Sequence, residues 1–141
     1  MDASLAIKLI LKGESMRAQA HQLFEDALAA GATLIAPALF ESELDSIVQR
    51  RVVESRMSSA DAARAYAGID DLDVVITSHP DLRRRARAIA AQFNQPKVYD
   101  STYAALAEFR GCEFWTADHA FYRAVKDKLS FVKYLADYPL P

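Results

Sequence analysis

Four short runs of apolar residues constrain the fold of this chain most strongly. They have the length of strands, are rich in β-branched and aromatic residues, and cover residues 33–37, 72–76, 113–116 and 130–135. A segment with helical periodicity follows each of the first three. Short strands that alternate with helices predict βαβ units. We therefore expect an α/β fold with a mostly parallel sheet, flanked by helices and connected by right-handed crossovers.

Apolar residues at helical spacing define two of the helices. One helix is predicted from about residue 82 to residue 93, with a capping box at Ser78 and Asp81. An earlier helix is predicted from the stripe Met16, Ala20, Leu23 and Ala27. Gly31 is where that earlier helix is expected to stop.

Length and composition limit the class of protein. A chain of 141 residues that is 52% hydrophobic fits one compact domain over residues 1–141. A net charge of −2 argues against binding nucleic acid or lipid through overall charge, so any polyanion must be met by a local basic patch. The single cysteine, Cys112, cannot form an internal disulfide and is expected to be a buried structural thiol.

The sequence also carries no targeting signal that we can recognise. No apolar run approaches the roughly 20 residues of a membrane span. The acidic residue at position 2 is unlike the basic start of a signal peptide. We expect a cytoplasmic protein without membrane contact.

Aspartates stand at three predicted helix starts. Asp118 follows a predicted strand and opens a helix, Asp100 precedes another helix, and Asp2 opens the first. Each alone is most simply a helix cap. At one sheet edge, however, several ionised carboxylates repel one another and usually need a cation. Oxygen ligands of this kind suit Mg²⁺ or Mn²⁺.

The helix after residues 33–37 offers a fourth carboxylate. Glu43 has Leu39 one turn before it and Ile47 one turn after it, which places it at the margin of a buried face. Glu41 should prefer solvent. Glu43 is therefore the better candidate for a site, although a surface glutamate whose stem covers apolar neighbours would show the same pattern.

Three stretches together resemble the PIN-domain ribonucleases, and among them the VapC-like toxins of bacterial toxin–antitoxin pairs. "MDASLAIKLIL" resembles the first helix of the family, and "APALFESEL" resembles the segment in which a glutamate lies six residues after a proline. "YDSTYAALAEFRGCEFWTAD" is similar to the stretch that ends in Thr-Ala-Asp. The resemblance implies a PIN-like three-layer α/β fold. It also implies an acidic metal site, with Thr116 and Ser4 nearby as orienting hydroxyls, formed by Asp2, Glu43, Asp100 and Asp118.

The function implied by this resemblance is a divalent-metal-dependent endoribonuclease that hydrolyses RNA phosphodiester bonds as the toxin of a VapBC-type pair. Mg²⁺ or Mn²⁺ would lower the pKa of the attacking water and neutralise the phosphate. The resemblance also implies a homodimer and a cognate antitoxin whose tail covers the acidic pocket. No histidine nucleophile is required, and only His119 lies near the site in sequence.

The chain departs from the family pattern in three places. The family has an apolar strand before its first aspartate, and here only Met1 precedes Asp2, so the first strand is expected to be absent from this chain. Either the true start lies upstream, or the sheet is short of a strand and Asp2 hangs from a mobile end. Ser46 stands where asparagine is frequent. Ser101 follows Asp100 where alanine is more usual.

An acidic pocket that admits RNA needs basic residues at its rim. The candidates are Lys8, Lys12, Arg50, Arg51, Arg56 and the run from Arg83 to Arg87, of which the last is more simply a solvated helix face. We expect single-stranded or looped RNA, whose bases can be splayed into a narrow site. The candidate stacking surfaces are Tyr99, Tyr103, Phe121 and Tyr122, although core packing explains most of them.

Two other functions remain open from the sequence. One is a catalytically silent PIN-like module that binds RNA or a protein, with its aspartates serving only as helix caps. The other is a PIN nuclease for RNA maturation that has no antitoxin.

Overall fold

The computed structural model describes all 141 residues as an α/β chain. The helices are α1 (Ala3–Ile10), α2 (Arg17–Ala29), α3 (Leu39–Val53), α4 (Ser59–Asp70), α5 (Leu82–Gln92), α6 (Tyr99–Arg110), α7 (His119–Val125) and the 3₁₀ turn η1 (Leu135–Asp137). The strands are β1 (Ile35–Ala36), β2 (Val75–Ile76), β3 (Phe114–Thr116) and β4 (Val132–Tyr134). Each strand lies inside one of the four predicted runs, so those predictions are confirmed.

The four strands form two separate parallel pairs. β1 pairs with β2, with Ile35 opposite Val75. β3 pairs with β4, with Phe114 opposite Val132. The predicted parallel pairing is confirmed, but the expected single sheet is divided, because no strand lies between the two pairs to connect them.

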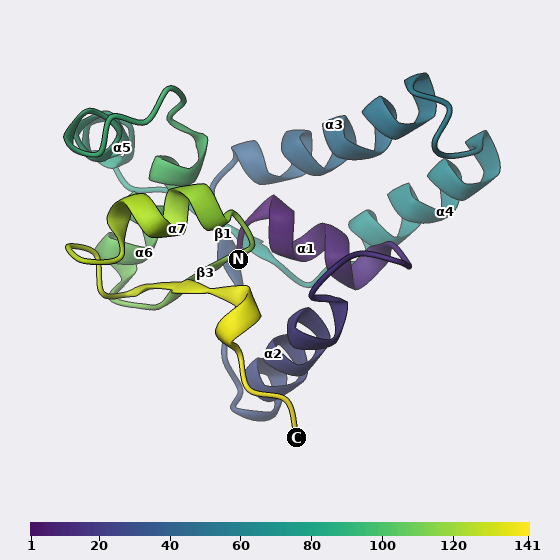
Figure 1. The fold of residues 1–141 in the computed structure, drawn as a ribbon, viewed down its shortest axis with the longest axis horizontal. Coiled ribbons are helices and arrows are strands. Elements are labelled where there is room, and N and C mark those ends of the chain that lie inside the picture. The colour runs from purple at the N-terminus through teal and green to yellow at the C-terminus, as the bar shows by residue number, and fades with distance from the viewer.

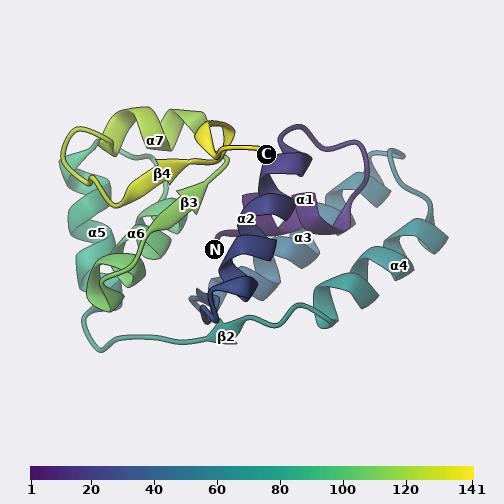
Figure 2. The same ribbon diagram turned by 90° about the horizontal axis from the view of Figure 1, so that it is seen from below.

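The elements gather into two groups around the amino terminus (Figures 1 and 2). In Figure 1, α1 lies between α2 on one side and α3 and α4 on the other. The second group consists of α5, α6 and α7 around β3 and β4, and an extended segment after β2 connects the groups (Figure 2). The chain start therefore lies where the two groups meet. No helix combines the length and the apolar character that crossing a membrane requires.

The predicted helices are present, with one difference in capping. Leu82, Ala86 and Ile89 are buried on α5, which confirms its apolar face. The capping box at Ser78 and Asp81 was wrong. Asp81 is the N-cap, but its carboxylate forms an ion pair with Arg84 at 3.0 Å and caps no backbone N–H.

The predicted end of the earlier helix is confirmed. α2 ends at Ala29, and Gly31 then adopts φ +68°. Glycine reaches this left-handed conformation without steric cost, so the chain can turn away from the helix there.

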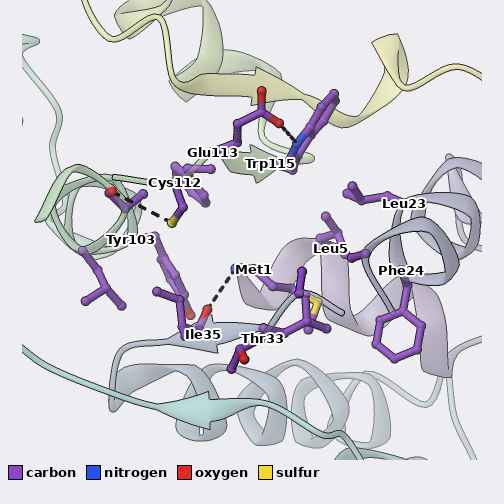
Figure 3. A pocket seen from close by; sticks show the side chains of 16 residues that line it. Met1, Leu5, Leu23, Phe24, Thr33, Ile35, Tyr103, Cys112, Glu113 and Trp115 are labelled. Atoms are coloured by element: carbon purple, nitrogen blue, oxygen red, sulfur yellow. Dashed lines mark hydrogen bonds between the residues drawn. The ribbon is translucent and has the colours of Figure 1, made fainter. Parts of the chain in front are cut away.

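A cavity of about 300 Å³ separates β1 from β3, and we call it the apolar hollow (Figure 3). Fourteen of its sixteen lining residues are hydrophobic. The ammonium group of Met1 points into it and donates a hydrogen bond to the carbonyl oxygen of Ile35 at 3.0 Å. Burial lowers the pKa of this ammonium. The division of the strands therefore leaves apolar surface and a desolvated chain terminus between them.

Cys112 lies on the wall of the apolar hollow and is exposed, so the prediction of a buried thiol was wrong. The residue follows the left-handed turn at Gly111 and precedes β3. A full sheet would cover a side chain at this edge, but here β3 has β4 on one side only.

Candidate active site

Asp2 is held in place by its own chain. It is the N-cap of α1, is only 2% exposed, and its Oδ1 accepts a hydrogen bond from the Leu5 N–H at 2.8 Å. The hydroxyl of Ser4 donates to the same carboxylate at 2.9 Å, and Thr116 Oγ1 donates to its Oδ2 at 2.7 Å. Burial raises the pKa of Asp2, and these hydrogen bonds oppose that rise. Asp2 is thus both the expected cap and an inward-facing carboxylate, and it does not hang from a mobile end.

Thr116 connects Asp2 to Asp118. Thr116 is the last residue of β3, and its Oγ1 accepts a hydrogen bond from the Asp118 N–H at 3.0 Å while donating to Asp2. Asp118 caps α7 by accepting from the Phe121 N–H at 2.8 Å. The start of α1 is therefore anchored to the junction between β3 and α7, across the boundary between the two groups of elements.

Glu43 on α3 is fixed by a residue that the sequence did not indicate for this role. The hydroxyl of Tyr103, on α6, donates to Glu43 Oε2 at 2.5 Å. The ring of Tyr103 is buried and stacks on Phe114 with 5.9 Å between centroids. Burial raises the pKa of Glu43, and the bond from Tyr103 opposes the rise. Glu41 is exposed, as expected.

Asp100 lies in the first turn of α6, and the other three carboxylates all affect its pKa. Its pKa is raised to about 7, first by burial and then by the negative charges of Asp2, Asp118 and Glu43. None of the ion pairs in the structure includes any of these four residues. We call the four the acidic cluster, and none of its carboxylates is paired with a side-chain cation.

The acidic cluster borders a cavity of about 520 Å³, which we call the acidic groove. Its walls are the start of α1, one face of α3 and the start of α6, and it is lined by Asp2, Glu43 and Asp100. Asp118 is not part of the lining and reaches the cluster through Thr116. The structure thus brings three predicted residues to one cavity and leaves the fourth, Asp118, outside its lining.

The donor set of the cluster consists only of carboxylate oxygens, which suits Mg²⁺ or Mn²⁺. The carboxylates are nevertheless spread apart. No three His, Cys, Asp or Glu side chains are gathered closely enough to form a ready-made metal cage. The chemistry of the donors fits a divalent cation, whereas their spacing leaves the carboxylates repelling one another.

Two residues of the site could have been found from their spacing. Tyr103 lies three residues after Asp100, and Lys97 lies three residues before it, where it also lines the acidic groove. The spacing of Tyr103 places it on the same helix face as Asp100. Tyr103 is a candidate stacking surface from the sequence, but its ring is buried in the core, and it serves the site through its hydroxyl instead.

The predicted basic rim is largely absent. Lys8 is buried beside Glu14 at 3.9 Å, and Arg51 is paired with the same glutamate at 2.8 Å, so Lys8 was a wrong choice. Of the predicted basic residues, only Arg50 lines the acidic groove. The run from Arg83 to Arg87 lies on α5 and contributes nothing to that lining. His119 is exposed, with its ring 5.0 Å from that of Tyr134, and is also outside the lining.

Comparison with known proteins agrees with this geometry. The family model of the PIN domain, a nuclease-type fold, matches residues 1–127, a range that includes the whole acidic cluster. No curated protein matches the chain significantly. The family match covers well over half of the chain. The helices and short parallel strands of the structure agree with a PIN-like fold. The chain therefore belongs to the PIN domain family.

Proposed function

We propose that the protein is a divalent-metal-dependent endoribonuclease that hydrolyses RNA phosphodiester bonds. The observation that carries this proposal is the gathering of Asp2, Glu43 and Asp100 on one groove, where burial first, and then the charges of the other cluster carboxylates, raise the pKa of Asp100 to about 7. A cluster of partly buried carboxylates is costly for the fold unless a cation neutralises it. Function is the simplest reason for a chain to retain it.

Asp2, Glu43, Asp100 and Asp118 would hold the Mg²⁺ or Mn²⁺ ion. When bound, such an ion lowers the pKa of the attacking water and neutralises charge on the phosphate. The remaining residues orient these ligands. Thr116 and Ser4 fix the carboxylate of Asp2, and Tyr103 fixes that of Glu43.

Substitution within the cluster tests the metal-nuclease proposal. Asp100→Asn and Asp118→Asn should each abolish Mn²⁺-stimulated cleavage of RNA, and a chelator should abolish cleavage by the unmodified protein. Asp45→Asn is the matched control, because Asp45 is exposed on α3 outside the acidic groove. If both cluster variants cleave RNA like the unmodified protein, the proposal fails.

We further propose that this nuclease is the toxin of a VapBC-type pair, acting in the cytoplasm as a homodimer under the control of a cognate antitoxin. The support is the resemblance of "YDSTYAALAEFRGCEFWTAD" and the order of the acidic residues along the chain. Expression should arrest bacterial growth, and Asp118→Asn should relieve the arrest. A PIN nuclease for RNA maturation would instead cleave RNA without arresting growth.

The second candidate function is a catalytically silent PIN-like module that binds RNA or a protein. It is favoured by the spread of the carboxylates and by the capping hydrogen bonds of Asp2 and Asp118. Calorimetric titration with Mn²⁺ separates the two candidates. A nuclease should bind Mn²⁺ and lose that binding in Asp100→Asn, whereas the silent module should show neither binding nor cleavage.

A further inference from the structure

The acidic groove has far more room than metal ions need. Its volume is about 520 Å³, whereas one water molecule in the liquid occupies about 30 Å³. The cluster carboxylates occupy only part of its lining, and the rest of the wall comes from α1, α3, the start of α6 and Lys97 just before it. A ligand larger than an ion can therefore lie along the groove.

Two cations line the acidic groove, and neither has a carboxylate partner. Arg50 lies near the end of α3, and Lys97 lies just before α6. No ion pair in the structure includes either residue. Arg51, next to Arg50, is instead paired with Glu14, and Arg85 on α5 is paired with Glu108. The two groove cations are thus free for an anionic ligand.

The two cations belong to different parts of the groove wall, and each part also carries a cluster carboxylate. Arg50 is two helical turns after Glu43 on the same face of α3, about 10 Å further along the helix axis. Lys97 precedes Asp100 by three residues on the other wall. A groove that carries one cation on each of two walls beside its carboxylates suits a polyanion with one phosphate at the metal ligands and its neighbours at the cations.

Tyr99 adds an aromatic surface to the same groove. It begins α6, lines the groove and is 50% exposed. By contrast, Tyr103 is buried, and Tyr122 stacks on Tyr134 with 5.4 Å between centroids. An exposed ring beside phosphate-binding cations is suited to stacking on an unpaired base.

We propose that Arg50, Lys97 and Tyr99 form a clamp for an unpaired segment of RNA. Arg50 and Lys97 bind the phosphates on the two sides of the one to be cleaved, and Tyr99 stacks on an adjacent base. Stacking requires a base that is free of its partner strand, so the clamp selects single-stranded or looped RNA over a duplex. This inference rests on the proposed nuclease function.

The test measures binding of a short unstructured oligoribonucleotide by fluorescence anisotropy, with Mn²⁺ and the Asp118→Asn protein to prevent cleavage. Arg50→Ala and Lys97→Ala should each weaken binding by roughly tenfold. Each should also reduce the slope of log affinity against log salt concentration by about 0.7. Tyr99→Ala should weaken binding by about fivefold or more, whereas Tyr99→Phe should bind like the parent protein.

Arg83→Ala is the matched control, because it removes the same charge from an exposed position of α5 outside the groove. It should leave the affinity within about twofold of the parent, since a distant exposed charge is screened by salt. The clamp is overturned if the Arg50 and Lys97 variants bind like the control, or if the duplex of the same sequence binds as tightly as the single strand. It is also overturned if an acidic peptide, rather than RNA, is bound through Arg50 and Lys97.

Cleavage by proteins with an intact cluster separates this inference from the nuclease proposal. If the clamp variants cleave RNA with an unchanged KM, the clamp fails and the nuclease stands. If binding follows the expected pattern but the unmodified protein cleaves no RNA, the clamp is supported and the nuclease fails.

Discussion

The acidic groove and the apolar hollow both lie where the two groups of elements meet, and they are built in opposite ways. Met1 lines the apolar hollow, the next residue, Asp2, lines the acidic groove, and Tyr103 lines both. In the acidic groove, hydrogen bonds from the protein orient the carboxylates of Asp2 and Glu43. In the apolar hollow, a desolvated ammonium has one carbonyl partner, and the facing walls lack packing contacts with each other.

This difference indicates that the acidic groove, and not the apolar hollow, is organised for function. Oriented carboxylates without a neutralising cation raise the free energy of the fold but prepare a site for charge, as functional sites often do. Unfilled apolar walls also cost stability, because they lack dispersion contacts, but they orient no reactive group. Changes at the two cavities should therefore differ in kind: at the groove they should alter cleavage or metal affinity, and at the hollow they should alter stability alone.

The largest effect is expected at Tyr103, which belongs to both cavities. Tyr103→Ala removes a buried ring and should lower the free energy of unfolding by about 3–5 kcal/mol. Tyr103→Phe keeps the ring and removes only the hydroxyl that binds Glu43, so it should cost about 1 kcal/mol or less of stability while weakening Mn²⁺ binding. Urea denaturation and calorimetry measure the two quantities. Equal Mn²⁺ affinity in Tyr103→Phe and the unmodified protein would exclude a role for the hydroxyl.

The next largest effect concerns the charge of Asp100 and depends on pH. The folded pKa, about 7, lies above the ordinary value of 3.8, so ionisation of Asp100 opposes folding. The cost is absent below about pH 4, grows as the pH rises to 7, and is complete above it. In metal-free buffer at pH 8, Asp100→Asn should raise the free energy of unfolding by up to about 4 kcal/mol, at about 1.4 kcal/mol per pKa unit.

Thermal denaturation between pH 4 and pH 8 measures this dependence. The gap in Tm between Asp100→Asn and the unmodified protein should widen with pH and then level off above pH 7. Asp45→Asn, at an exposed position, should show no widening. A gap that does not change with pH would contradict the assigned repulsion.

A smaller effect is expected at Thr116, which joins the two aspartates. Thr116→Val keeps the shape of the side chain but removes the hydroxyl that bonds Asp2 and Asp118. Because buried polar groups lose a partner, the free energy of unfolding should fall by about 1–3 kcal/mol, and RNA cleavage should fall with it. Thr102→Val is the control, since the Thr102 hydroxyl bonds only the exposed turn at Val98. Equal losses of stability and cleavage in both variants would show that the hydrogen bonds of the Thr116 hydroxyl to Asp2 and Asp118 are not required.

The smallest effect is expected from filling the apolar hollow. Ala27 lines the hollow from α2, and Ala27→Leu should raise the free energy of unfolding by about 0.5–2 kcal/mol. Trp115 also lines it, so its fluorescence should change while RNA cleavage stays the same. Ala29→Leu, at an exposed position of the same helix, should do neither. A loss of cleavage in Ala27→Leu would contradict the separation of the two cavities.

Much of the local structure could be predicted from the sequence. The four strand positions, the apolar face of α5 and the caps at Asp2 and Asp118 all depend on residues close together in the chain. The side chain of Glu43 also lies at the margin of a buried face, as its apolar neighbours predicted. The metal-binding role of the four carboxylates stays a prediction.

Two of the errors arose from packing that the local pattern does not specify. Lys8 was taken for a rim residue, but the approach of Glu14 and the packing of α1 bury it. Cys112 was expected inside, but β3 lacks a neighbouring strand on that side. In both cases the local pattern was compatible with either outcome.

The sequence by itself determined where helices and strands form and which carboxylates stand at helix starts, because periodicity and capping act over a few residues. Only the tertiary structure decided that Tyr103 binds Glu43 across 60 positions and that Thr116 binds Asp2 across 114. It also divided the strands into two pairs and placed Lys97 and Arg50 on one groove. These features depend on how whole elements pack, and the packing is set by the burial of many distant side chains together.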